Sequence, residues 1–131
     1  MFLSRLHDHE KVAFLQLAHH VTRSDAEVSP EEGIILAQYC FEMGSPDAEY
    51  DAVEFDLDVV LGKFDEDHRN IVVLELTALA HADGKVSEHE GLILDRVIKH
   101  FNMREPVAII YREWAKNVMS LYLQGEALIS L

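Results

Sequence analysis

Cysteine and positive charge are scarce in this chain, and long apolar runs are missing from it. The single cysteine, Cys40, cannot form an internal disulfide, which favours a reducing compartment and predicts a cytoplasmic protein. Lysine and arginine number 11 against 24 aspartates and glutamates, so a formal charge of −13 would repel nucleic-acid backbones and anionic membranes. No apolar run approaches the roughly 20 residues that cross a bilayer. We therefore expect neither nucleic-acid binding nor membrane insertion.

The motifs of several catalytic classes are also missing. The chain has 8 histidines but no Glu-x-x-His pair and no His-Glu-x-x-His helix, so di-iron bundles and zincins would lack their ligands. There is no glycine-rich phosphate loop and no basic aromatic patch. His7 and His9 could hold a metal, but their place near the amino end favours an exposed, fraying terminus. These absences predict a protein that is not an enzyme.

Helical periodicity is the main pattern that the sequence does contain. Its 131 residues, 49% of them apolar, suit one globular domain with a sizeable core. Apolar residues at helical spacing predict a helix from Asp8, which can cap it, to about Thr22. The residues expected to face the core from this helix are Phe14, Leu17, Ala18 and Val21.

Two later helices are predicted to begin at capping boxes. Ser29 is followed by Glu32 three residues later, and Ser87 is followed in the same way by Glu90. In each box the serine and the glutamate can satisfy backbone amides at the start of a helix. The residues expected to stop these two helices, because both tolerate a left-handed backbone, are Gly44 and Asn102.

The remaining segments are a linker, a central helix and a last helix. Residues 45–64 form the linker, with one brief helix that Asp56 or Asp58 can cap. The helix after Asp65 is apolar on more than one face, so we expect it at the centre of the bundle. A C-terminal helix is predicted over about 106–124. Its expected inward residues include Ile110 and Leu121, and Gly125 is expected to fray its end.

A shift of 58 residues superimposes the two capping boxes and their flanking loops. Positions 25–36 then fall on 83–94, and the same aspartate, valine, serine, glutamate, glycine, isoleucine and leucine recur. This repeat predicts an all-α fold, a compact helical bundle of two helix–loop–helix halves about a pseudo-twofold axis. The halves are about 8–44 and 65–102, and with the C-terminal helix they make a single domain, 1–131.

A glycine recurs inside the first turn of both capped helices. Gly33 and Gly91 occupy equivalent positions, where glycine costs about 0.5–1 kcal/mol relative to alanine. Because the repeat keeps this cost twice, we expect the backbones of two helices to approach closely there.

The loop in front of each capping box concentrates possible metal ligands. Asp83 to Glu90 matches part of an EF-hand calcium loop, but the first two ligand positions would be Leu79 and His81, which offer no oxygen ligand. One loop is therefore insufficient, and a divalent cation would need ligands from both loops or imidazoles from one loop. The candidate metal ligands are Asp83, Glu90, Asp25, Glu32, His81 and His89.

The recurring residues also have a purely structural explanation. The two glutamates complete capping boxes, and the loop aspartates can accept hydrogen bonds from loop amides. Val28 and Val86 can plug the core beneath their loops. On this interpretation no ligand is needed, and the domain serves protein–protein contacts alone.

The junction Asp83-Gly84-x5-Glu90, the Ala-His-Ala sequence at 80–82 and their duplication at Asp25–Glu32 resemble the TerB-like (tellurite-resistance protein B) family. The resemblance covers roughly residues 9 to 122. It implies a compact all-helical domain in a bacterial cytoplasmic protein tied to metal or chemical stress and to membrane-associated complexes. Related domains fused to a J-domain chaperone imply a protein-interaction role. The resemblance also implies cation binding at the acidic junction residues, although Ala26 stands where the family has glycine.

These observations lead to one leading hypothesis and two alternatives. The leading hypothesis is a non-enzymatic TerB-like module that can bind a divalent metal ion at its acidic loops. The sequence does not identify the ion or any other cofactor. The partner of this module would be another protein or a second copy of the chain in a homodimer. The first alternative is the structural interaction domain without metal. The second is a small metal-dependent hydrolase, which needs an open coordination position beside a cleft.

Overall fold

The computed structural model describes residues 1–23, 28–82 and 84–131. These residues contain helices and no strand, which confirms the predicted all-α fold. Two short 3-10 turns, η1 and η2, precede the first and fourth α-helices. The elements in order are η1 (Leu3–Arg5), α1 (Asp8–Thr22), α2 (Pro30–Met43), α3 (Leu57–Leu61), η2 (Glu66–His68), α4 (Arg69–Ala80), α5 (Glu88–His100) and α6 (Glu105–Ile129).

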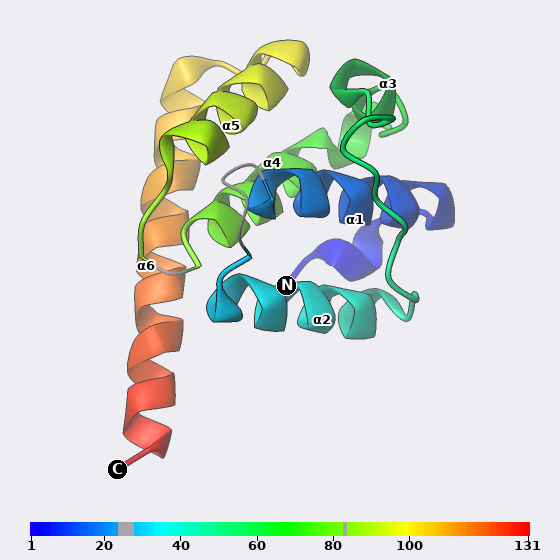
Figure 1. Ribbon diagram of the computed structural model, residues 1–131. Coiled ribbons are helices and arrows are strands. Elements are labelled where there is room, and N and C mark those ends of the chain that lie inside the picture. The colour runs from blue at the N-terminus through cyan, green and yellow to red at the C-terminus, as the bar shows by residue number, and fades with distance from the viewer. Residues whose placement is uncertain (24–27, 83) are drawn as a thin grey trace.

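The helices form two pairs beside one long helix. Figure 1 shows α1 and α4 between α2 and α5, and both α2 and α5 begin on the side along which α6 runs. The C-terminal turns of α6 extend past the rest of the bundle. Within the described residues no helix is long and apolar enough to cross a membrane.

Helix α4 lies at the centre of the bundle, as its apolar pattern predicts. Val72, Leu76 and Leu79 have no exposed surface, and α4 contacts α1, α2, α5 and α6. The opposing face of α1 is equally buried, because Phe14 and Leu17 are also fully covered. One core therefore serves both halves of the chain.

The two capping boxes adopt nearly the same geometry. The N-cap dihedrals are φ −66°, ψ 156° at Ser29 and φ −67°, ψ 159° at Ser87. In each box the serine hydroxyl accepts a hydrogen bond of 3.1 Å from the backbone N–H of the glutamate. The helix stops also match, because Gly44 has φ 60° and Asn102 has φ 55°. The sequence repeat thus corresponds to a repeat in backbone structure.

The N-cap of α1 is His7 rather than Asp8. The His7 backbone is extended, with φ −72° and ψ 158°, and its N–H donates to Glu10 Oε1 at 2.7 Å. Asp8 is instead the first helical residue. The side chains of His7 and His9 are exposed, as expected, but the buried Glu10 carboxylate holds the backbone at the start of α1.

The linker is ordered by contacts with α1. Asp56 accepts the Val59 amide at 3.3 Å and caps α3, as expected. Further upstream, the buried His19 ring lies 2.7 Å from Asp47 Oδ1, and His20 Nδ1 lies 2.7 Å from the Tyr50 hydroxyl. The end of α1 and the linker are therefore tied together by side chains.

The expectation that two loop valines plug the core is wrong. Val28 is 39% exposed and Val86 is 36% exposed. A residue directly before an N-cap usually packs on the side chain at the fourth helical position. That position is Gly33 in α2 and Gly91 in α5, so each valine lacks the side chain against which it would pack.

No other helix approaches closely at these two glycines. The expectation that helix backbones meet at Gly33 and Gly91 is therefore wrong. A Cβ atom added at Gly33 or Gly91 would meet no described atom within 4 Å beyond its own helix.

We predict that Gly33→Ala and Gly91→Ala each raise the free energy of unfolding by about 0.5–1 kcal/mol, because alanine loses less backbone entropy. Urea titrations would measure it. As a control, Gly44→Ala should destabilise, because φ is +60° there. A loss of stability at Gly33 and Gly91 would contradict the prediction.

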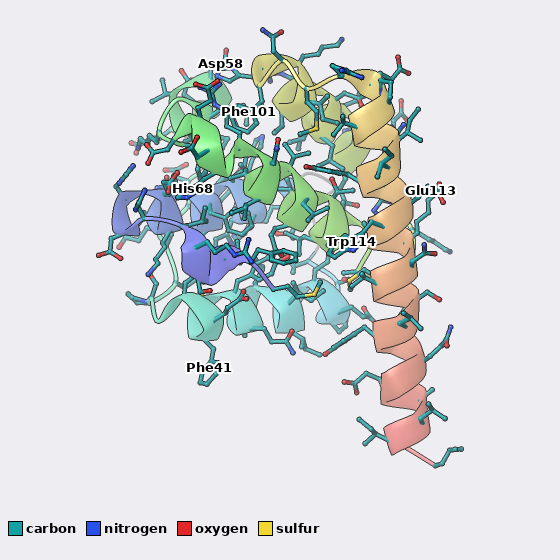
Figure 2. All side chains as sticks on the ribbon, turned by 180° about the vertical axis from the view of Figure 1, so that it is seen from behind. Phe41, Asp58, His68, Phe101, Glu113 and Trp114 are labelled. Atoms are coloured by element: carbon teal, nitrogen blue, oxygen red, sulfur yellow. The ribbon has the colours of Figure 1, made fainter. Side chains whose placement is uncertain are left out.

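Helix α6 is longer than predicted, and its inward face agrees with the prediction only in part, because Tyr111, Trp114 and Val118 pack against the core as expected. It continues through Gly125 to Ile129, and its buried residues are Ala108, Ala115 and Met119. Ile110 and Leu121, expected to point inward, are 64% and 66% exposed. Apolar residues lie on more than one side of α6, so the period alone could not select the buried side. Figure 2 shows Trp114 on the inner side of this helix and Glu113 on its outer side.

Candidate functional site

The glutamates of the two capping boxes meet inside the protein. Glu32 and Glu90 are each only 5% exposed. Oε1 of each carboxylate accepts the backbone N–H of its own N-cap serine, at 3.0 Å in α2 and 3.1 Å in α5. The Glu90 side chain also interacts with the Glu32 side chain. Two acidic side chains that are 58 residues apart in the sequence therefore form a buried pair.

This arrangement is electrostatically unfavourable when both carboxylates are ionised. Glu90 Oε2 is buried and has no hydrogen-bond donor among the described residues. Burial, and then the neighbouring Glu32 carboxylate, raise the pKa of Glu90 to about 7, although the Ser87 amide partly opposes the shift. A proton or a cation between the two carboxylates would supply the missing interaction. The pair can therefore take up positive charge near neutral pH.

The other sequence-predicted ligands are placed differently. Asp25 and Asp83 lie outside the described residues. His81 is buried, its Nδ1 lies 2.8 Å from the Thr77 carbonyl oxygen, and its ring borders a hollow between α4, α5 and α6. His89 is exposed. The described residues do contain a group of side chains that could hold a metal ion, but it lies elsewhere. It includes neither His81 nor His89, and neither Glu32 nor Glu90.

That group lies near the amino end of α1, where the sequence reasoning considered a metal at His7 and His9 but did not find Glu10, Asp65 and His68. His7, Glu10, Asp65 and His68 each offer one ligand atom, and these four atoms lie within 4.8 Å of one another. Figure 2 shows His68 beside α1, at the end of the molecule away from α6. His9 lies close to the group, with its Nε2 3.8 Å from Asp65 Oδ1. We call these five residues the His7–His68 cluster.

Glu10 is the centre of this cluster. Its side chain is fully buried, and Oε1 accepts the His7 amide and the His68 Nδ1–H, both at 2.7 Å. Its other oxygen accepts the Asp65 amide at 2.9 Å. Burial opposes the charge of Glu10, but these hydrogen bonds outweigh it and lower the pKa. Glu10 is therefore an ionised, fully hydrogen-bonded carboxylate that joins α1 to η2.

Two sequence signals could have indicated the cluster. The sequences His7-x-x-Glu10 and Asp65-x-x-His68 each place two ligand types one helical turn apart, in orders that the search for Glu-x-x-His did not include. In addition, the 58-residue shift superimposes His7 on Asp65 and Glu10 on His68. The repeat predicts a pseudo-twofold axis, and equivalent positions of the two halves can touch only near such an axis. The contact between Glu10 and His68 could therefore have been expected from the repeat.

Comparison with known proteins identifies no relative of this chain. No protein-family model, no curated protein and no solved structure matches this chain. The resemblance to the TerB-like family stays a prediction from the sequence. The functional conclusion therefore depends on the two side-chain groups described above.

Proposed function

We propose that this protein is a non-enzymatic, cytoplasmic, TerB-like module that binds a divalent cation between the two capped helices. Glu32 and Glu90 are the ligands that we assign from described residues. Asp25 and Asp83, which precede them in equivalent loops, are the further ligands that the sequence suggests. In this role the protein would couple cation binding to contacts with a protein partner during metal or chemical stress, as in tellurite resistance.

The observation that supports this proposal most strongly is the buried Glu90 Oε2 atom, which has no donor among the described residues. Leaving a charged oxygen buried and unpaired is costly, and such atoms in proteins usually have a proton, a water or an ion as partner. Among the described residues, the charged group that acts on the Glu90 carboxylate is the Glu32 carboxylate, which has the same sign. Oxygen ligands favour hard cations such as calcium, magnesium or manganese.

Cation titration with isosteric variants tests this proposal. Metal-free protein is titrated with calcium, magnesium, manganese and zinc at pH 7.5 while the melting temperature is followed. A cation at 100 times its dissociation constant should add about 2.7 kcal/mol to the free energy of unfolding. The double variant Glu32→Gln/Glu90→Gln should lose this gain. Glutamine retains a side-chain oxygen that can accept the serine amide, so the capping boxes can stay intact.

A matched control removes the same charge from the same two helices. Glu31 and Glu88 lie in the first turns of α2 and α5 and are exposed. The variant Glu31→Gln/Glu88→Gln should keep the full response to the cation. If none of the hard cations changes the melting temperature, or if the change survives in Glu32→Gln/Glu90→Gln, the cation role is refuted.

The alternative is a structural interaction domain without metal, and the intact capping boxes favour it. Each glutamate already accepts the amide of its N-cap serine. On this alternative a proton shared by Glu32 and Glu90 replaces the cation. The titration described above then gives no response to calcium, magnesium or manganese, while cap removal by Ser87→Ala still costs about 0.5–2 kcal/mol.

A further inference from the structure

The His7–His68 cluster combines ligand types that differ from those of the glutamate pair. Its members come from the start of α1 and from η2, and they include three imidazoles. His7 Nε2 lies 3.2 Å from Asp65 Oδ2, and the ring centroids of His7 and His68 are 4.8 Å apart. Mixed imidazole and carboxylate ligands suit zinc and other transition ions, whereas calcium and magnesium prefer sites made of oxygen ligands.

Glu10 fixes the orientation of the His68 ring. Both Glu10 oxygens accept backbone N–H groups, so the carboxylate is also the acceptor in its 2.7 Å contact with His68, and Nδ1 of the ring is the donor. A neutral imidazole with a proton on Nδ1 has its lone pair on Nε2, which is the atom that can bind a metal. A carboxylate that holds the second ring nitrogen of a metal-binding histidine is a common arrangement in zinc sites. Glu10 would thus act as a positioning residue rather than as a ligand.

Three residues of the cluster are accessible to an ion from solvent. The side chains of His7, His9 and Asp65 are 60%, 59% and 48% exposed. The His68 side chain, at 16%, is less exposed, and Glu10 is covered. The cluster thus has an accessible side made of two imidazoles and a carboxylate, and a buried side that holds the third imidazole.

We propose that His7, Asp65 and His68 form a second metal site, which binds a divalent transition ion such as zinc. The exposed His9 side chain would supply an additional ligand. The site would tie the start of α1 to the start of α4, across the two halves of the chain. It differs from the glutamate pair in residues, in place and in the class of metal that it selects.

Zinc titration of the metal-free full-length protein tests this site. Isothermal titration with zinc chloride at pH 7.5 should show a binding event that the variant His7→Asn/Asp65→Asn lacks. Both side chains are about half exposed or more, so the variant should keep its fold, which circular dichroism would verify. In two-dimensional NMR of the imidazole nitrogens, zinc should shift the His7 and His68 signals and leave those of His89 in place.

Two control variants separate this site from other sources of binding. His89→Asn removes an exposed histidine from a different helix, and Glu32→Gln/Glu90→Gln removes the glutamate pair. Both should bind zinc as the wild type does at the His7–His68 cluster. If zinc does not bind, or if it binds equally to His7→Asn/Asp65→Asn, the proposed site does not exist. Neither result affects the glutamate pair, which is tested by hard cations.

Discussion

Replacing Glu10 with alanine is expected to lower the free energy of unfolding by about 3–5 kcal/mol, because an acceptor paired with buried donors is lost. The carboxylate is fully buried and accepts from the His7 amide, the Asp65 amide and His68 Nδ1. Without it, these partly buried donors lose their acceptor. Each buried donor left unsatisfied costs about 1–3 kcal/mol.

Chemical unfolding in urea, followed by circular dichroism, measures this loss. Glu113→Ala is a suitable control, because Glu113 is 64% exposed on α6 and its contact with Lys116 Nζ is 3.5 Å long. An exposed pair of this kind should contribute little, so the control should change stability by no more than about 0.5 kcal/mol. If Glu10→Ala costs no more than Glu113→Ala, the buried carboxylate does not hold α1 and η2 together.

The second large effect is the pH dependence of the metal-free protein. The pKa of Glu90 is about 7 in the folded protein, against an ordinary value of 4.5. Between these values the unfolded chain has released the proton while the folded protein still holds it, so rising pH favours the unfolded state. The contribution of Glu90 to stability is therefore full below pH 4.5 and is lost as pH rises through 7. The total loss is about 3 kcal/mol.

Comparison with Glu90→Gln isolates this contribution from all other titrations. Glutamine cannot ionise, so the difference in unfolding free energy between wild type and variant should decrease by about 3 kcal/mol from pH 4.5 to pH 8. Glu88→Gln, an exposed change in the same helical turn, should leave the wild-type pH dependence in place. Parallel curves for wild type and Glu90→Gln would contradict the raised pKa.

Local signals in the sequence account for the features that were predicted correctly. Serine, glutamate and the residue at the helix stop act within a few residues, so the starts and ends of α2 and α5 could be assigned without tertiary information. The burial of α4 followed from apolar residues on several faces. Glu32 and Glu90, which the repeat offered as ligands pooled from both halves, interact in the structure, whereas Asp25 and Asp83 lie outside the described residues.

The errors arose where the outcome depends on a neighbour far away in the sequence. Val28 and Val86 look like core residues until Gly33 and Gly91 are recognised as the positions against which they would pack. His7 looks like part of a loose terminus until Glu10 is seen to accept its amide in a buried site. In α6, apolar residues on several sides left the buried side undetermined, and contacts with α4 select it.

Two related halves in one chain can make contacts that a symmetric homodimer of one half cannot. In such a homodimer each position on the twofold axis would face its own copy, so both members of the contact would be identical. Joining the halves removes this restriction. At positions 10 and 68 the chain carries glutamate opposite histidine, 2.7 Å apart, and the imidazole Nδ1–H donates to the carboxylate. Positions 32 and 90 have kept the identical residue, so two like charges face each other as they would in a dimer.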